Sequence, residues 1–161
     1  MTTTNVQEQE TQPGDVQKQD SPMTIDKVLE MKGYVVISTA GQSMMPMLRN
    51  RRDASEIRAV DGPLKKYDVA LFLKGKQYVL HRIIKVLPDG YILRGDNSRQ
   101  KDFVKREQIL GVLVAFQRSK KHHTVKEPFY LVYSRLTVWF HSPKMFVQRV
   151  KGKLKRMLLC R

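Results

Sequence analysis

Residues 68–86 read DVALFLKGKQYVLHRIIKV. The apolar runs at both ends of this stretch are rich in β-branched and aromatic residues, which is typical of buried strands. Between the runs, Gly75 and Lys76 form a short turn signal. Because so short a turn joins antiparallel neighbours, the stretch predicts a β-hairpin with strands at 68–73 and 77–86.

Further strands are expected on both sides of this hairpin. Residues 34–38 (YVVIS) are short and β-branched, residues 91–95 follow the turn signal at 88–90, and residues 109–116 form another apolar run. Strands this close together, with short turns and no alternation with helices, predict a mainly β fold. We expect a small coiled antiparallel sheet or barrel.

The chain is expected to have three parts. Residues 1–22 are polar and poor in apolar side chains, which predicts a disordered tail. Residues 23–118 hold the strands and form the compact domain, which begins with a helix at about 24–31 that ends at Gly33. Residues 119–161 form a basic, helical tail.

The tail carries most of the net positive charge of the chain. The net charge is +15, and residues 118–161 contain twelve Lys or Arg against one acidic residue, Glu127. Pro128 and Pro143 divide the tail into two predicted helices, and the second is amphipathic, with a basic face. We expect residues 129–161 to contact an anionic membrane surface. The same pattern also fits a core helix with a solvated basic face or a helix that pairs with a partner.

Several other classes of protein are not favoured. Nucleic acid is not expected as a partner because no reader motif accompanies the charge. No run of about 20 apolar residues and no secretory signal occurs, so we expect a peripheral membrane or cytoplasmic protein. The single cysteine, Cys160, excludes an internal disulfide. His122 and His123 have no Cys, Asp or Glu around them, so no metal and no cofactor is expected.

A candidate nucleophile follows the strand at 34–38. Residues 41–46 read GQSMMP, so Ser43 lies between a glycine and a proline on a tight turn that exposes its hydroxyl and backbone N–H. A serine hydroxyl needs a base within hydrogen-bonding reach. Of the four histidines, only His81 lies inside the predicted core, and its ordinary pKa suits it to accept that proton.

A Ser–His pair also needs a carboxylate that orients the imidazole. Asp96 follows Gly95 after a strand, and Asp102 lies a few residues further on. Either can fill this role, and the remaining aspartates leave the choice open on composition alone.

Five short segments, read in order, resemble the signal peptidase I family and its wider superfamily, which includes self-cleaving repressors. The resemblance covers residues 38–116 and has a histidine where most bacterial relatives place lysine. The matching segments are Ser43-Met44-Met45-Pro46, Tyr67-Asp68-Val69-Ala70, His81-Arg82-Ile83-Ile84, Gly95-Asp96-Asn97 and Gly111-Val112-Leu113.

The resemblance implies a serine endopeptidase, in a short form without an N-terminal anchor, that cleaves the signal or leader peptide of a preprotein. Ser43 would be the nucleophile, His81 the general base and Asp102 its orienting group, with Asp96 supporting the site or sharing that task. The Ser43 N–H would bind the oxyanion. Substrate and oxyanion contacts would come from the flanking residues Gly41, Gln42, Met44 and Pro46.

Two other functions remain open. The domain could be a non-catalytic module that binds peptides or membranes, because a fold does not fix a function. It could also be a self-cleaving regulator, although Ala40-Gly41 lies too close to Ser43 to reach the site. The sequence leaves the substrate and the oligomeric state undetermined.

Overall fold

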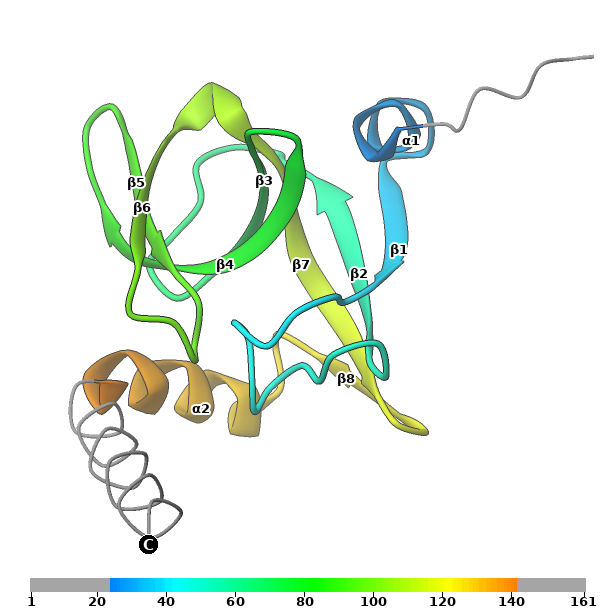
Figure 1. Ribbon diagram of the computed structural model, residues 1–161, viewed down its shortest axis with the longest axis vertical. Coiled ribbons are helices and arrows are strands. Elements are labelled where there is room, and N and C mark those ends of the chain that lie inside the picture. Colours follow the sequence, from blue (N-terminus) through cyan, green and yellow to red (C-terminus); the bar gives the residue numbers. More distant parts are fainter. Residues whose placement is uncertain (1–23, 142–161) are drawn as a thin grey trace, which may run out of the picture.

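The computed structural model describes residues 24–141, which form one antiparallel sheet with a helix at each end (Figure 1). The helices are α1 (Ile25–Lys32), α2 (Pro128–Trp139) and the 3₁₀ turn η1 (Arg106–Gln108). The eight strands are β1 (Tyr34–Ser38), β2 (Ala54–Ala59), β3 (Val69–Lys74), β4 (Gln77–Val86), β5 (Gly90–Arg94), β6 (Lys101–Lys105), β7 (Ile109–Arg118) and β8 (Lys121–Thr124).

The sheet is strongly coiled but does not close into a barrel. Its strand order is β1-β2-β7-β3-β4-β5-β6, and β8 pairs with β7 outside this path. The predicted mainly β fold is therefore confirmed in its coiled-sheet form. Two groups of buried apolar side chains fill the interior, one around Leu48, Ile57 and Leu113 and the other around Ile83 and Leu93.

The hairpin predicted at 68–86 is present as β3 and β4, paired with Leu71 opposite Leu80 and Ala70 opposite His81. All four apolar residues from Val69 to Phe72 are buried, as the uninterrupted run predicts. The second half of β4 pairs also with β5, whereas residues 77–81 pair with β3 alone. This first half of β4 therefore has one unpaired edge.

Three strands, β2, β6 and β8, are absent from the sequence prediction, and of these only β6 holds a candidate site residue, Asp102. β2 (ASEIRA) and β6 (KDFVK) contain few apolar residues, yet buried positions recur at every second residue in β6 and in the first four residues of β2. In β6 the buried positions are Asp102 and Val104. An inward-facing carboxylate breaks the apolar alternation by which such a strand is recognised.

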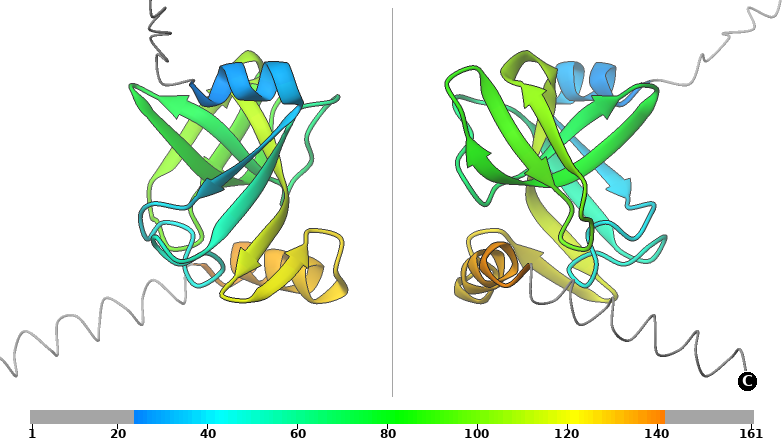
Figure 2. Two further views of the ribbon diagram at one scale, coloured as in Figure 1. Left: turned by 90° about the vertical axis from the view of Figure 1, so that its right-hand side faces the viewer. Right: turned by 60° about the vertical axis from the view of Figure 1, so that its left-hand side comes forward.

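The helices lie at opposite ends of the sheet (Figure 2). α1 is the helix predicted at 24–31, and it ends where Gly33 adopts a left-handed φ of 74°. α2 begins at Pro128, as predicted, and buries Tyr130 and Ser134. None of the helices described between residues 24 and 141 is both long and apolar enough to cross a bilayer.

The expected boundary at residue 118 falls within the β7–β8 hairpin, where Arg118 pairs with Lys121. Tyr130 belongs to the same core cluster as Leu113, so residues 121–134 are continuous with the packing of the sheet. The polar tail expected at 1–22 and the second tail helix expected after Pro143 lie outside the described residues.

Candidate active site

Ser43 lies in the connection between β1 and β2, and Asp53 holds this connection closed at its base. The buried Asp53 carboxylate accepts hydrogen bonds from the Arg49 amide (2.9 Å), the Ser119 amide (3.2 Å) and the Arg52 side chain (2.7 Å). Its carbonyl accepts the Thr39 hydroxyl at 2.8 Å. Burial opposes ionisation, but these hydrogen bonds outweigh it and lower the pKa of Asp53.

The apolar residues after Ser43 anchor the loop to the hydrophobic core. Met44, Met47 and Leu48 are buried in the core, whereas Ser43 is half-buried and Pro46 is exposed. The Ser43 carbonyl accepts the Asn97 amide at 2.6 Å, which ties the loop to the segment after β5. The Ser43 N–H makes no hydrogen bond within residues 24–141 and is available as a donor.

Gly95 brings the serine and the histidine together. A Cβ placed on Gly95 would lie 2.9 Å from Ser43 Cβ and 3.1 Å from His81 Nε2. The two candidate residues therefore flank one small space that only a glycine leaves open. No hydrogen bond joins the Ser43 hydroxyl to His81 in the described chain, and in free enzymes such bonds are often long until substrate binds.

The imidazole of His81 is buried and is held by Asp102. His81 Nδ1 lies 3.2 Å from Asp102 Oδ2. A carboxylate at this distance accepts the Nδ1 proton, so the lone pair of the neutral ring lies on Nε2, the nitrogen beside Gly95. Burial lowers the pKa of His81, and the Lys74 ammonium lowers it further, whereas Asp102 acts in the opposite direction. The neutral form therefore prevails at pH 7.

Asp102 lies on β6, at one of the two positions of this strand that face inward. Its second oxygen, Oδ1, accepts a hydrogen bond from Lys74 Nζ at 2.6 Å. Lys74 lies at the end of β3, where its side chain is partly exposed. Asp102 is thus held between a lysine on one oxygen and the histidine on the other, which fixes the carboxylate against the ring.

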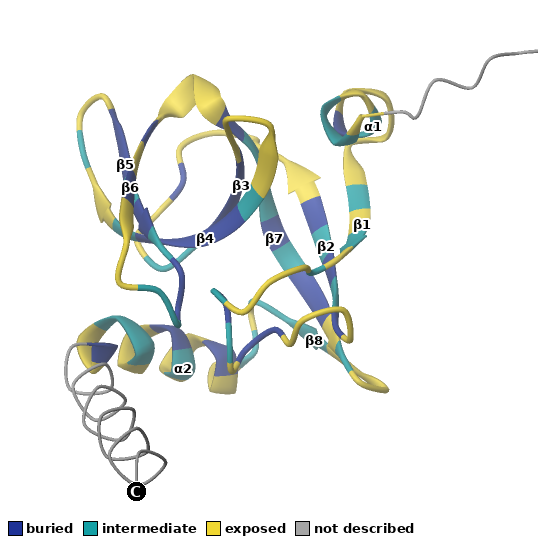
Figure 3. Cartoon of the chain, in the orientation of Figure 1, coloured by how far each residue is buried: buried dark blue, intermediate teal, exposed yellow. Residues whose placement is uncertain are grey.

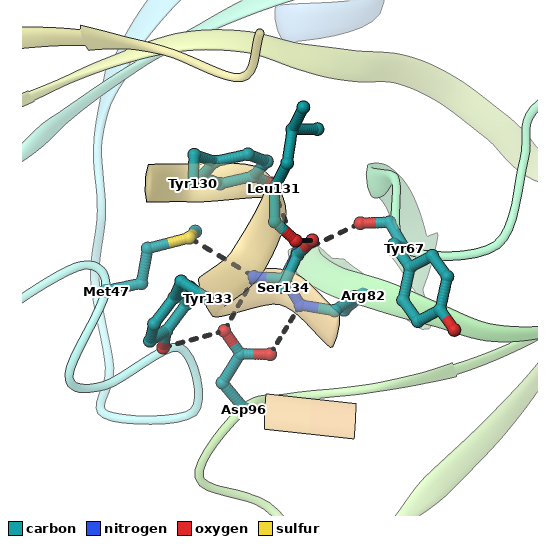
Figure 4. A network of polar contacts seen from close by, with 8 residues as sticks. All are labelled: Met47, Tyr67, Arg82, Asp96, Tyr130, Leu131, Tyr133 and Ser134. Atoms are coloured by element: carbon teal, nitrogen blue, oxygen red, sulfur yellow. Dashed lines mark hydrogen bonds and ion pairs between the residues drawn. The ribbon is translucent and has the colours of Figure 1, made fainter. Parts of the chain in front are cut away.

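Asp96, the other predicted carboxylate, is paired with Arg82 (Figure 4). Arg82 Nε and Nη2 donate to the two Asp96 oxygens at 2.8 and 2.7 Å, and the Tyr133 hydroxyl donates at 3.2 Å. Asp96 therefore lies behind Gly95 in a buried ion pair. Asp102 is the aspartate that holds the imidazole.

Arg82 extends this contact into a network that joins five parts of the fold: β4, the segments before β3 and after β5, the Ser43 loop and α2. Its Nη1 donates to the Tyr67 carbonyl (2.9 Å) and the Tyr130 hydroxyl (3.1 Å), and its Nη2 donates to Met47 Sδ (3.3 Å). Burial opposes the charge, but the Asp96 carboxylate outweighs it and raises the pKa of Arg82. The network braces β4, the Ser43 loop and α2 against one another.

A groove of about 270 Å³ leads to Ser43 between two strand edges. One side is β1 with its continuation to Gly41, and the other is the unpaired first half of β4, residues 77–80. Ile37, Met44 and Leu80 supply the apolar part of the groove lining, and Ser38, Thr39 and Gln77 supply a polar part. An extended peptide could add to these edges as a strand.

The predicted flanking residues divide between different surroundings. Gly41 and Met44 line the groove, and Gln42 is exposed. Pro46 lines a separate cavity of about 290 Å³ between the loop and α2. The Gly41 N–H donates to Asn50 Oδ1 at 2.9 Å, so this amide is already engaged.

Two of the other histidines have contacts of their own, and the expectation that no acidic residue lies near His122 and His123 is wrong for His123. His123 contacts Glu127 Oε2 at 3.0 Å, and His141 Nε2 lies 2.7 Å from the Ser98 carbonyl. Among residues 24–141, no three His, Cys, Asp or Glu side chains are grouped as a metal site.

Sequence reasoning singled out Ser43, His81, Asp96 and Asp102 but missed the residues that support them. Arg82 belongs to one of the matching segments, but no local pattern marks Arg82, Lys74, Tyr130 or Tyr133 as part of the site. A charged residue inside the apolar run 79–86 is the signal that could have indicated a buried ion pair at Arg82. No protein-family model matches this chain, and no curated protein matches it significantly.

Proposed function

We propose that this protein is a serine endopeptidase in which Ser43 is the nucleophile, His81 the general base and Asp102 the group that orients His81. The observation that carries the proposal is the approach of Ser43 Cβ and His81 Nε2 to one point over Gly95, with a carboxylate on the opposite ring nitrogen. Nucleophile, base and orienting group in this order suit acyl transfer.

The reaction follows from these positions. The Ser43 oxygen attacks the carbonyl carbon of the scissile peptide bond while His81 Nε2 takes the hydroxyl proton. The Ser43 N–H donates to the oxyanion that forms. His81 then gives the proton to the leaving amine as the C–N bond breaks. Water attacks the acyl-serine ester, its proton passes through His81, and Ser43 is released with the new carboxylate.

We propose an extended signal or leader peptide of a preprotein as the substrate. The unpaired edges of β1 and of residues 77–81 offer backbone hydrogen bonds to a peptide laid between them. The groove is small and apolar where it reaches Met44, which suits small, uncharged side chains before the scissile bond.

The experiment is mass spectrometry of a panel of preproteins and leader peptides incubated with the full chain on anionic vesicles. We expect cleavage after a small residue, lost in Ser43→Ala and in His81→Ala but retained in the control Ser98→Ala. Circular dichroism establishes that each variant is folded.

Three outcomes count against this mechanism. Unchanged cleavage in either Ser43→Ala or His81→Ala would remove that residue from the reaction. Peptide binding without any cleavage would favour the binding module. A discrete shortened form of the pure protein, absent in Ser43→Ala, would favour the self-cleaving regulator.

A further inference from the structure

α2 carries apolar side chains on the face that points to solvent, in addition to those on the face that packs against the sheet. Phe129 and Trp139 are 75% and 73% exposed, and Val132, Leu136 and Phe140 are also exposed. Their spacing of three and four residues puts them on one side of the helix and its C-cap, Phe140, away from the buried Tyr130 and Ser134. Phe129, at the start of the helix, also borders the cavity beside Pro46. We call these five exposed residues the α2 ridge. Figure 3 shows α2 at the end of the molecule, with its outer side exposed.

A basic cluster lies beside the ridge. A cleft of about 150 Å³ lies between α2 and the segment that leads into β3, and it is lined by Lys65, Lys66 and Arg135. Lys66 Nζ and Arg135 Cζ lie 5.2 and 5.6 Å from the centroid of the Tyr67 ring, so that both cations gather around one aromatic side chain.

None of these three cations forms an ion pair within residues 24–141. The nearest carboxylate in the cleft, that of Asp68, accepts the Lys65 backbone amide at 2.7 Å. The cluster therefore presents an excess of positive charge, three cations to one carboxylate, next to an apolar surface.

We propose that α2 docks this protein on an anionic lipid bilayer: the α2 ridge enters the headgroup region, and Lys65, Lys66 and Arg135 bind lipid phosphates. Exposed Trp and Phe beside Lys and Arg are the composition of interfacial helices. A net charge of +15 favours an anionic surface and disfavours a second copy of the same chain.

This docking surface does not depend on peptidase activity, but it bears on the site. Tyr130 and Tyr133, on the inner side of α2, donate to or accept from the Arg82–Asp96 pair behind Gly95. The helix that meets the bilayer therefore also braces the candidate active site. A bound preprotein would be processed close to the membrane surface.

Trp139 tests this proposal directly because it is the only tryptophan of the chain. Full-length protein is titrated with vesicles of phosphatidylglycerol and phosphatidylcholine, and with pure phosphatidylcholine vesicles. With the anionic vesicles we expect a blue shift of Trp139 emission and quenching by brominated lipids, both of them retained in Ser43→Ala. Retention in that variant separates docking from catalysis.

Two pairs of variants refine the test. Phe129→Gln with Leu136→Gln should weaken vesicle affinity about tenfold or more, since binding scales with the apolar area buried. Met31→Gln with Phe103→Gln removes two exposed apolar residues that lie outside α2 and should change little.

Neutralising the basic cluster gives the second comparison. Replacing Lys65, Lys66 and Arg135 by Gln should cost about fivefold in affinity per residue, or on the order of 100-fold together. The control, with Lys76, Lys85 and Lys101 replaced by Gln, has the same net charge and should bind nearly as the parent does.

Two results would overturn the proposal. The first is cosedimentation with vesicles while Trp139 emission stays unchanged, which would place the lipid contact elsewhere in the chain. The second is a blue shift that appears with rising protein concentration and no lipid, together with a dimer in sedimentation velocity. That result would identify a second copy as what covers the ridge.

Discussion

Arg82 and Asp96 form a bidentate ion pair in the interior, with both side chains almost fully removed from solvent. The pair lies directly behind Gly95, the residue on which Ser43 and His81 converge. His81 and Arg82 are neighbours on β4 and face opposite sides of it, so one strand supplies both the imidazole and the cation that braces its surroundings.

Removing one partner of this pair should be strongly destabilising. Arg82→Met leaves the buried Asp96 carboxylate without its counter-ion, and we expect the free energy of unfolding to fall by about 3–5 kcal/mol. Urea denaturation followed by circular dichroism measures the change. Arg58→Met is the control, because it breaks the exposed pair with Glu56 and should cost about 1 kcal/mol or less. Equal losses in the two variants would contradict the assignment.

The pH dependence of activity should report the burial of His81. Because burial lowers the pKa of His81 below 6.5, kcat/KM should rise with pH to a midpoint below that value and stay high at pH 7. The free energy of unfolding should also increase with pH over this range. The unfolded chain binds the proton more readily, so the free energy of unfolding should fall as pH drops below 6.5.

Lys74 offers a way to move that midpoint. Its ammonium contacts Asp102 and lowers the pKa of His81, so Lys74→Met should shift the acidic midpoint of kcat/KM upward. Lys76→Met removes an exposed charge from the adjacent turn and should leave the profile in place. A downward shift in Lys74→Met would show that this lysine does not oppose protonation of the ring.

The apolar strands of this fold could be predicted from sequence, and the polar ones could not. β3 and β4 consist of long β-branched and aromatic runs, whereas β2 and β6 owe their place to neighbouring strands. In β2 a buried serine, Ser55, takes a position that the alternation pattern assigns to an apolar side chain. Tertiary context therefore decides these two strands.

The candidate site divides in the same way. Ser43 and His81 could be identified because each is marked by its own sequence neighbours: Ser43 by a Gly/Pro turn, and His81 by the apolar residues of a strand. The choice of Asp102 over Asp96 depends on the pairing of β5 with β6, which turns Asp102 inward. The contacts of Arg82 with Tyr130 and of Tyr133 with Asp96 span 48 and 37 residues, so no local pattern indicates them.

Ser55 itself provides a stability test. Its hydroxyl is fully buried and has no hydrogen-bond partner among the described residues. Because an unsatisfied buried hydroxyl carries a desolvation cost, Ser55→Ala should raise the free energy of unfolding by about 1 kcal/mol. The matched change Ser134→Ala removes an equally buried hydroxyl that donates to the Leu131 carbonyl at 2.9 Å, and it should not stabilise. A gain of equal size in both variants would mean that hydrogen bonding is not the cause.

Gly95→Ala should lower kcat/KM about 100-fold while the fold survives. The added methyl group would lie 2.7 Å from the Ser43 carbonyl oxygen as well as against Ser43 Cβ and His81 Nε2, and the carbonyl cannot rotate away as a side chain can. The nucleophile and base must therefore separate, and a displacement of about 1 Å can cost about 100-fold in rate.

The control for that change is Gly62→Ala. Gly62 has a left-handed φ of +84° and open space around it, so alanine should reduce stability by about 1 kcal/mol while kcat/KM stays near that of the parent. Assays of kcat/KM beside thermal unfolding separate the two effects. If Gly95→Ala lost stability but kept its rate, Ser43 and His81 would not need to approach each other across Gly95, and the proposed nucleophile–base pair would fail.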